Sequence, residues 1–480
     1  MITSDRMAQV DRNAEALGVP RKQLMESSGN AVARVVREHA EPGDEVVIVA
    51  GRGNNGGDAF VAARFLDEFA VETLLLGRAE TITTDIAREN WDALQQGAYE
   101  TREVRDSADF SLPDCDLVVD AMLGTGVTGA LREPEATAAE AINQSSAYVV
   151  SVDVPSGVDA DTGESYGTAV KADHVVTFHD DKPGLEAVDA PIITVADIGI
   201  PAAAELFVEA GDLLALSRDP HAHKGDFGEV LVVGGGPYTG APALAGQAAM
   251  RAGADLVHIA CPETVARDVQ GFEEGLIVHE LSGGLLQPKH VDELLDRALD
   301  ANCVILGPGL GRASGTLDAV REFLEAYDGR AVVDADALRA VPDTETDADL
   351  LCTPHQGELV AMGGETAEEW QERTALVESF AADLGHTLLV KGAYDVISDG
   401  ETTRVNRTGN PGMTVGGTGD VLAGICGALA STHDPVEAGG IAAYVNGTAG
   451  DSVVDEQGYG MFASDLLPEI PHAMWGGRDE

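Results

Sequence analysis

Lysine, cysteine and long apolar runs are all scarce in this chain of 480 residues. No uninterrupted apolar run approaches the roughly 20 residues that a membrane-spanning helix needs, so we expect no membrane association. The opening stretch MITSDRMAQVDRNAEALG is charged and has no apolar signal-peptide core, which predicts a cytoplasmic protein. The 5 cysteines are scattered without a CxxC pair, which indicates free thiols in a reducing compartment.

Positive charge is also scarce, with 30 basic residues against 82 acidic ones and a net charge of −52. Such a surface repels a phosphate backbone, which excludes nucleic acid as a partner. The acids are spread along the chain, in the style of proteins from the salt-rich cytoplasm of halophilic archaea, where salt screens their repulsion. A lysine that is retained in such a lysine-poor chain is therefore more often needed for function than a lysine in an ordinary protein. The lysines are Lys22, Lys171, Lys182, Lys224, Lys289 and Lys391.

The first half of the chain alternates short apolar strands with helices, as in a doubly wound α/β sheet. EVVIVA at Glu45–Ala50 is predicted to be a buried strand that runs into the glycine-rich stretch GRGNNGGD and then a helix. Further strands are expected at 72–76, 116–120 and 147–152, with helices over 11–39. Three strands end in polar, glycine-bearing segments, at 54–58, 120–130 and 153–159. Because carboxyl ends of parallel strands form the ligand crevice, we predict one site there.

The second half repeats the alternation of strands and ligand-type loops, which predicts another α/β domain. Residues 199–220 are predicted to form a closing helix and a connector. We place the boundary near residue 212, giving domains 1–212 and 213–480. The chain has no long linker rich in serine, glycine or proline at this point.

The stretch GNPGMTVGGTGDVLAG, from Gly409 to Gly424, carries the strongest signal. It predicts a glycine-rich loop that feeds the N-terminus of a buried helix, where unpaired N–H groups and the helix dipole suit a phosphate. Asp420 would lie at that anion site as a base or an acid/base relay. The alternative is an ordinary glycine-rich turn before a core helix, just as Asp120 and Asp153 could merely cap turns.

The motifs NNGGD, DAMLGTGVTG, SVDVPSGVD and LMESSGNAV resemble the YjeF-type NAD(P)H-hydrate epimerase family over residues 1–210. The resemblance implies a Rossmann-like domain that acts on hydrated nicotinamide cofactors. It implies a potassium ion held by Asn55, Asp120 and Ser156, whose oxygen atoms suit a hard cation. Asp153 is expected to handle a proton or hydroxyl, and Lys182 either to assist that step or to bind phosphate. The implied substrate-binding residues are Asn54, Asn55, Gly56, Gly57, Asp58, Gly124, Thr125, Gly126, Val127, Thr128, Gly129, Ala130 and Asp153.

The motifs HKGDFG, YTGAP, GPGLG, TPHQGE, VKG and NPGMTVGGTGDVLAG resemble the ADP-dependent NAD(P)H-hydrate dehydratases over residues 213–480. That family is related to the thiazole and hydroxymethylpyrimidine kinases, and it implies a ribokinase-like domain. The fold class implied for the chain is therefore α/β, with two three-layer αβα domains. The implied substrate-binding residues are Ala241, Gly309, His355 and Asp420. The implied nucleotide-binding residues are Lys391, Gly392, Ala393, Tyr394, Asp395, Gly417, Thr418 and Gly419.

This resemblance implies a repair reaction in which the 6-hydroxyl of the hydrated ring is phosphorylated from ADP and phosphate is then eliminated. Asp420 would be the base, backbone N–H groups at Gly417–Gly419 would stabilise the phosphoryl group, and magnesium is expected from the phosphoryl chemistry. His355 could instead be a histidine that is merely hydrogen-bonded in a loop. One rival function is an ATP-dependent kinase of vitamin precursors with a non-catalytic, ligand-binding front domain. Another is a non-catalytic nucleotide sensor or scaffold. We also expect a homo-oligomer, whose size the sequence does not set.

Overall fold

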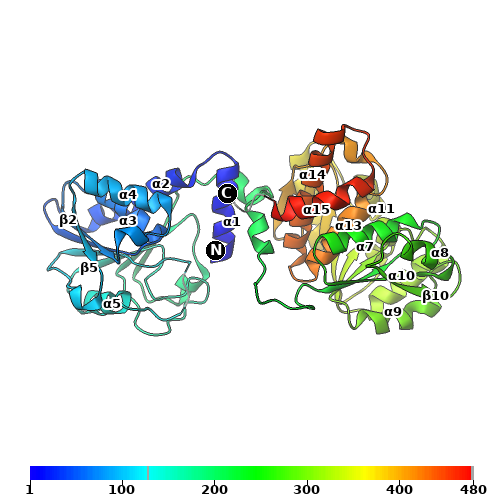
Figure 1. Ribbon diagram of the computed structural model, residues 1–480, viewed down its shortest axis with the longest axis horizontal. Helices are drawn as coiled ribbons and strands as arrows, with labels where there is room; N and C mark the ends of the chain where they lie inside the picture. Colours follow the sequence, from blue (N-terminus) through cyan, green and yellow to red (C-terminus); the bar gives the residue numbers. More distant parts are fainter. Residues whose placement is uncertain (127–128, 477–480) are drawn as a thin grey trace. The chain divides into compact units, whose positions relative to one another are not determined.

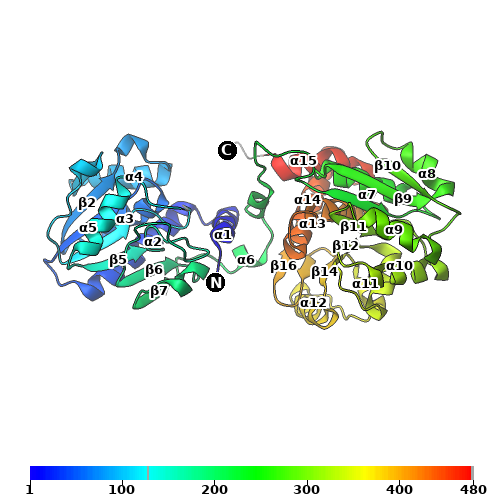
Figure 2. The ribbon, with the colours of Figure 1, turned by 90° about the horizontal axis from the view of Figure 1, so that it is seen from below.

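The computed structural model describes residues 1–126 and 129–476. The chain forms two compact units, Met1–Ala204 and Glu205–Glu480 (Figures 1 and 2). The division falls before the boundary predicted near residue 212, because the segment after Ala204 attaches to the second unit. Phe207 bridges Val405, and Arg404 Nη2 lies 2.8 Å from Asp212 Oδ1. No helix among the described residues is both long and apolar enough to cross a membrane.

The first unit is built on a sheet of seven parallel strands in the order β3-β2-β1-β4-β5-β6-β7. The strand order reverses between β1 and β4, which is the point where doubly wound sheets bind ligands. In this register Val49 lies opposite Asp120. The strands are β1 (Glu45–Ala50), β2 (Ala70–Leu76), β3 (Glu100–Val104), β4 (Leu117–Ala121), β5 (Tyr148–Val152), β6 (His174–Phe178) and β7 (Ile192–Ala196).

Helices cover both faces of this sheet, which explains why its central strands are apolar without alternation. The helices are α1 (Ser4–Ala16), α2 (Arg21–His39), α3 (Asn54–Arg64), α4 (Asp85–Gln96) and α5 (Glu135–Gln144). One core cluster joins the sheet to α1, α2, α3 and α4, and another joins it to α5. The closing helix predicted within 199–220 is wrong. Only α6 (Ala203–Leu206) and a 3-10 turn at Asp212–Leu216 form there. Gly199, at φ +88°, is not helical, and after α6 the chain pairs with β16 (Thr403–Asn406), since Phe207 bridges Val405 and Val208 N donates to Val405 O at 2.9 Å.

The second unit contains a nine-stranded sheet in the order β10-β9-β8-β11-β12-β13-β14-β15-β16. The pairs from β10 to β14 are parallel, and β15 and β16 add an antiparallel hairpin at one edge. The order reverses between β8 and β11. The strands are β8 (Glu229–Val233), β9 (Leu256–Pro262), β10 (Ile277–Leu281), β11 (Cys303–Leu306), β12 (Arg330–Val333), β13 (Asp349–Cys352), β14 (Thr387–Val390), β15 (Asp395–Ser398) and β16 (Thr403–Asn406).

Helices again cover both faces, so each unit has three layers as predicted. The helices are α7 (Gly240–Arg251), α8 (Glu263–Gln270), α9 (Val291–Ala298), α10 (Ser314–Ala326), α11 (Gln356–Ala361), α12 (Trp370–Leu384), α13 (Thr418–Ala430), α14 (Pro435–Gln457) and α15 (Leu466–Trp475). One core cluster holds α7, α8, α13, α14 and α15, and another holds α9 to α12. Helix α13 is central to its layer, since every residue of Val421–Ala430 is buried.

Gly424 allows α13 to lie directly against α7. A Cβ atom at this position would lie 2.2 Å from the carbonyl oxygen of Ala245 and 2.7 Å from the Cβ of Ala248. We expect Gly424→Ala to lower the free energy of unfolding by about 1–3 kcal/mol, the usual cost of overpacking. Urea unfolding would measure this change. The matched control is Gly315→Ala in α10, where the new Cβ makes only ordinary contacts, and an equal loss in both variants would contradict the expectation.

Candidate active sites

The switch point of the first sheet is formed by close backbone contacts between the segments after β1 and β4. A Cβ atom at Gly51 would lie 1.8 Å from Met122 O, and one at Gly56 would lie 2.2 Å from Gly51 O. Glycine is therefore required for this approach. Helix α3 begins at Asn54, so the NNGGD residues form its first turns and not a loop before it, which differs from the sequence prediction.

Asp120, Ser156 and Asn55, the predicted metal ligands, meet at this switch point. Asp120 is fully buried and accepts hydrogen bonds from Ser151 Oγ at 2.8 Å, Ser156 N at 2.9 Å and Ser156 Oγ at 2.6 Å. Burial raises the pKa of Asp120, while the serine hydrogen bonds act against that rise. Leu123 N donates to Ser156 Oγ at 3.0 Å, and a Cβ atom at the next residue, Gly124, would lie 3.4 Å from Asn55 Oδ1.

The side-chain amide of Asn55 is buried and has no hydrogen-bond partner among the described residues. A buried amide without a partner is costly unless a ligand completes it. The surrounding donor set consists of carboxylate, hydroxyl and amide oxygen, which are the ligands that hard cations prefer. The arrangement therefore fits the predicted oxygen-bound cation.

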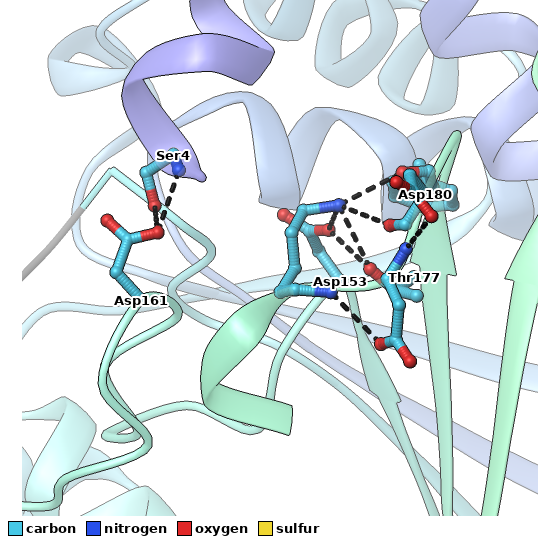
Figure 3. Close-up of polar contacts among 8 residues, drawn as sticks. Ser4, Asp153, Asp161, Thr177 and Asp180 are labelled. Carbon is cyan, nitrogen blue, oxygen red and sulfur yellow. Dashed lines mark hydrogen bonds and ion pairs between the residues drawn. The ribbon is translucent and has the colours of Figure 1, made fainter. Parts of the chain in front are cut away.

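The partly buried Asp153, after β5, forms an ion pair with the fully buried Lys182, after β6 (Figure 3). Lys182 Nζ lies 3.6 Å from Asp153 Oδ1 and donates to Thr177 Oγ1 at 3.2 Å and to the carbonyls of Phe178 and Asp180, both at 3.0 Å. Asp153 adopts φ +68°, a left-handed conformation that costs a non-glycine residue about 1–3 kcal/mol and often marks a functional position. A fully buried lysine held by carbonyls beside a strained aspartate is typical of a functional site.

The other predicted residues of the first unit surround these groups. Asn54 Oδ1 accepts from Thr84 Oγ1 at 2.8 Å, and Gly57 packs against Met25, where a Cβ atom would lie 2.8 Å from the sulfur. Burial raises the pKa of Asp58 well above its usual range, and Asp153 and Asp11 add to that rise. The loop after β4 carries Gly124, Thr125, Gly126, Gly129 and Ala130. Val127 and Thr128 lie outside the described residues.

The second unit places the start of α13 at one wall of a cavity of about 650 Å³. Gly417 caps the helix at φ +101°, a conformation that favours glycine. Thr418 Oγ1 donates to Met413 O at 2.9 Å and so holds the preceding loop against the helix. The first N–H groups of α13 have no carbonyl partner within the helix, because the first backbone bond is Val421 N to Gly417 O. This is the anion-binding geometry predicted from the glycine-rich stretch.

Lys391, Asp334 and Asp420 are the charged groups at this helix start. Lys391 Nζ lies 3.1 Å from Asp334 Oδ1, and a Cβ atom at Gly419 would lie 3.4 Å from the same nitrogen. Burial and the charge of Asp334 raise the pKa of Asp420 to about 7, against the opposing effect of Lys391. A carboxyl that titrates near neutral pH at a helix N-terminus is suited to act as a general base.

The cavity gathers most of the residues predicted to bind the nucleotide. His355, Lys391, Gly392, Ala393, Asp395, Thr418 and Gly419 line it, together with the loop 408–415. Tyr394 stacks on Trp370 with ring centroids 5.2 Å apart. Asp395 has a structural task, since it accepts from Gly392 N and Asn406 Nδ2, both at 2.9 Å, and burial raises its pKa to about 6.

The predicted contacts for the hydrated cofactor lie in three loops. Gly309 adopts φ +75°, and a Cβ atom added to it would lie 3.3 Å from the Cβ atom of Ala241. These two residues therefore meet at the switch between β8 and β11. His355 caps α11, with its Nδ1 accepting from Glu358 N at 3.1 Å, and its side chain also borders the cavity. Both interpretations of His355, capping and ligand contact, remain compatible with this geometry.

Asp334 and Asp11 were not among the predicted site residues. Asp334 follows β12, lies buried, and bonds Thr353 Oγ1 at 2.7 Å as well as Lys391. The acidic end of the strand RAVVDADAL was its only signal in the sequence. Asp11 lies in helix α1, and burial together with Asp153 raises its pKa to about 6. Nothing in the spacing of α1 distinguished Asp11 from the surface acids.

Comparisons with known proteins match both halves of the chain. The NAD(P)H-hydrate dehydratase family profile matches residues 230–472, and the profile for the YjeF-related protein N-terminus matches residues 21–184. The bifunctional NAD(P)H-hydrate repair enzyme of Methanothermobacter thermautotrophicus is 43% identical over 98% of this chain and 94% of its own length. That of Pyrobaculum aerophilum is 44% identical over 98% of both chains. This chain belongs to the bifunctional NAD(P)H-hydrate repair enzyme family.

Membership of the repair enzyme family confirms the resemblance found in the sequence for both halves. A solved ribokinase-like superfamily protein from Enterococcus faecalis V583 shares the fold, with a TM-score of 0.50, 23% identity, and coverage of 56% of this chain and 95% of its own. The predicted fold class is also confirmed: the repair enzyme has an N-terminal YjeF-type domain and a C-terminal ribokinase-like domain, both with parallel-sheet cores. The rival interpretation as a vitamin-precursor kinase is less supported, because these relatives span both domains.

Proposed function

We propose that this enzyme restores hydrated NADH and NADPH in two reactions carried by its two units. The first unit interconverts the R and S hydrates, and the second dehydrates the S hydrate with ADP and releases AMP and phosphate. The observation that carries the proposal is Asp420 at the open start of α13, beside Lys391 and the cavity. The two named relatives are NAD(P)H-hydrate repair enzymes, and their similarity to this chain covers 94% and 98% of their own lengths.

In the first unit, Asp153 is the group that we propose to exchange protons with the substrate hydroxyl. The Lys182 ammonium, 3.6 Å away, orients and electrostatically stabilises its carboxylate. Asn55, Asp120 and Ser156 would hold the potassium ion. When bound, that ion supplies a fixed positive charge toward an anionic part of the substrate, in keeping with the unpartnered Asn55 amide. The segments 54–58 and 124–130 flank the switch point and are proposed to bind the cofactor.

In the second unit, we propose that Asp420 removes the proton of the 6-hydroxyl as that oxygen attacks the β-phosphorus of ADP. AMP leaves, and elimination of phosphate from the ring then restores the dihydronicotinamide. Lys391, Gly392, Ala393, Tyr394 and Asp395 would lie along the nucleotide. The N–H groups at Gly417–Gly419, at the start of α13, would stabilise the charge that develops on the transferred phosphoryl group. Ala241, Gly309 and His355 are proposed to contact the hydrated cofactor.

Magnesium is proposed to arrive with the phosphates of ADP. Among the described residues no group of three or more His, Cys, Asp or Glu side chains could hold a metal ion. Magnesium bound to nucleotides needs only one or two carboxylates besides phosphate oxygens and water. Asp334 is a buried carboxylate whose charge acts on Asp420 at the start of α13, so the site fits a magnesium–ADP complex while Asp420 stays available as the base. The ion neutralises the developing phosphoryl charge when it is bound.

The test is recovery of dihydronicotinamide absorbance from a chemically prepared mixture of both hydrates. The chain would be supplied with ADP, magnesium and potassium at high salt. Complete recovery supports both activities, and recovery limited to the S fraction supports only the second. A vitamin-precursor kinase would instead consume ATP with its own substrate and restore no absorbance. A nucleotide sensor would bind ADP without turnover. Absence of ADP-dependent recovery would refute the proposal.

The pKa of Asp420 predicts how dehydration depends on pH. Burial and Asp334 raise that pKa to about 7, and a general base works only when it is ionised. We therefore expect kcat/KM for the S hydrate to rise about tenfold per pH unit below the pKa and to level off above it. Initial rates at limiting substrate across this range measure the profile. A flat profile through the pKa of about 7 would contradict the assignment of Asp420 as base.

Three further expectations remain predictions. The acidic composition, with a net charge of −52, suits a cytoplasm rich in salt. The substrates place the enzyme where nicotinamide cofactors work, which supports a cytoplasmic location. A homo-oligomer is also proposed, and sedimentation at high salt would determine its size.

A further inference from the structure

Helix α1 is fastened to the loops that carry Asp153 and Lys182. Ser4 N and Ser4 Oγ donate to Asp161 Oδ1 at 2.8 and 3.2 Å (Figure 3). Ile2 N donates to Asp181 O at 2.8 Å. Asp161 lies in the segment after β5 and Asp181 in the segment after β6. Near the other end, Asn13 Nδ2 donates to Ala204 O at 3.0 Å in a buried contact. The helix is therefore held in place against the first site.

Asp11 lies on the face of α1 that is turned toward this site. It follows Ser4 by two helical turns, so both side chains lie on the same side of the helix. The charges that act on Asp11 are those of Asp153, Arg21 and Lys182, and Asp58 in turn responds to Asp153 and Asp11. The carboxyl groups of Asp11 and Asp153 thus lie within the field of Lys182, and Asp58 lies within the field of those two carboxyl groups.

Asp11 and Asp58 differ from the structural acids of this unit. Among the described residues none donates a hydrogen bond to either carboxyl group, whereas Asp120 has four such contacts and Asp161 bonds Ser4. A partly buried carboxyl group that accepts no hydrogen bond lowers the stability of the folded state, because its lost hydration is not replaced. Such groups are candidates for function when they lie in a ligand crevice.

Inversion at the hydroxyl-bearing ring carbon needs two proton-exchanging groups, one on each face of the ring. One acid protonates the departing hydroxyl, and the C–O bond breaks as the lone pair of the ring nitrogen forms a C=N bond. Water then adds to the opposite face while a carboxylate takes its proton. One water leaves and one enters, one proton is given and one is taken, and the reverse reaction exchanges the two roles. The pair must therefore hold one proton between its members.

We propose that Asp11 is the second acid/base residue of the epimerase site and works with Asp153 on opposite faces of the hydrated ring. This proposal rests on the epimerase function proposed above. In this proposal Asp153 acts on the substrate from the carboxyl end of β5 and Asp11 acts from helix α1.

The pKa shifts of Asp11 and Asp58 favour Asp11 for this role. Burial and Asp153 raise the pKa of Asp11 to about 6, close to the range in which a group can both give and take a proton. Burial, Asp153 and Asp11 raise the pKa of Asp58 well above its usual range, which makes Asp58 less suited than Asp11 to take up a proton.

The test measures interconversion of the hydrates in the full chain without ADP, so that the second unit does not consume the product. Pure R hydrate is supplied, and R and S are separated by chromatography. We expect Asp11→Asn to lower the rate by about 10²- to 10⁴-fold, the usual contribution of a general acid or base. The matched control, Asp5→Asn, removes the same charge from an exposed position of α1 and should keep the wild-type rate. Asp11→Glu should restore part of the activity.

The pH profile separates a chemical role from a structural one. Wild-type kcat/KM should bend near pH 6, where Asp11 titrates, and Asp11→Asn should lack that bend. Equal rates for wild type and Asp11→Asn, or a lower rate with the bend retained, would overturn the assignment. Suppose that Asp11→Asn gives one of these contradicting results while wild type interconverts the hydrates and Asp153→Asn does not. Then only the role of Asp11 is overturned. If wild type shows no interconversion, the proposed epimerase function fails as well.

Discussion

An Asp420→Asn variant is expected to dehydrate the S hydrate about 10²- to 10⁴-fold more slowly than wild type, as loss of a general base implies. The substitution keeps the size of the side chain and the start of α13 but removes the group that can accept the hydroxyl proton. The N–H groups of the helix and Lys391 remain, so binding of ADP should change little. Initial rates with ADP and pure S hydrate would show a fall in kcat with KM nearly unchanged.

The stability of this variant provides a second check. A folded-state pKa of about 7 lies above the ordinary aspartate value, so the folded state binds this proton more tightly than the unfolded state. The contribution of this group to stability is therefore lost as the pH rises from the ordinary aspartate value to about 7, and the loss is complete in alkaline buffer. Asp420→Asn should be at least as stable as wild type in alkaline buffer. Asp300→Asn, at an exposed position, serves as the control, and an unfolded Asp420→Asn would contradict this account.

The sequence predicted those parts of each site that lie within one continuous motif. Asp420 and Gly417–Gly419 belong to a single glycine-rich stretch, and the structure places them at a helix start beside a cavity. Asp334 could not be found in this way, because it reaches Lys391 only through the pairing of β12 with β13 and of β13 with β14. Its partner in space is 57 residues away in sequence.

The strands were predicted more securely than the connections. A run such as EVVIVA is buried on both faces and has no other stable place than a central parallel strand. Residues 199–220 have enough alanine and leucine for a helix, yet only short helical segments form there because Phe207 and Val208 pair with Val405 of β16. Asp11 shows the same limit for function, since the role that we propose for it depends on how Ser4 and Asn13 hold α1 in place.

An Asp153→Asn variant is expected to lose epimerisation by about 10²- to 10⁴-fold while it keeps dehydration of the S hydrate. Asparagine is the appropriate replacement because Asp153 adopts φ +68°, a conformation that asparagine tolerates better than alanine does. Substitution of Lys182 would be less informative, since it would leave Thr177 Oγ1 and two carbonyl oxygens without their buried donor. Asp189→Asn, at an exposed position of the same unit, is the matched control.

The time course with mixed hydrates separates loss of epimerisation from general damage. Wild type and Asp189→Asn should restore the absorbance completely in one enzyme-dependent process. Asp153→Asn should give a rapid phase whose amplitude equals the S fraction, because the second unit remains intact. A slow phase should follow at the rate of spontaneous epimerisation and should not change with enzyme concentration. If the slow phase accelerates when more Asp153→Asn enzyme is added, another group sustains epimerisation without Asp153. Asp11 would be the first residue to examine in that case.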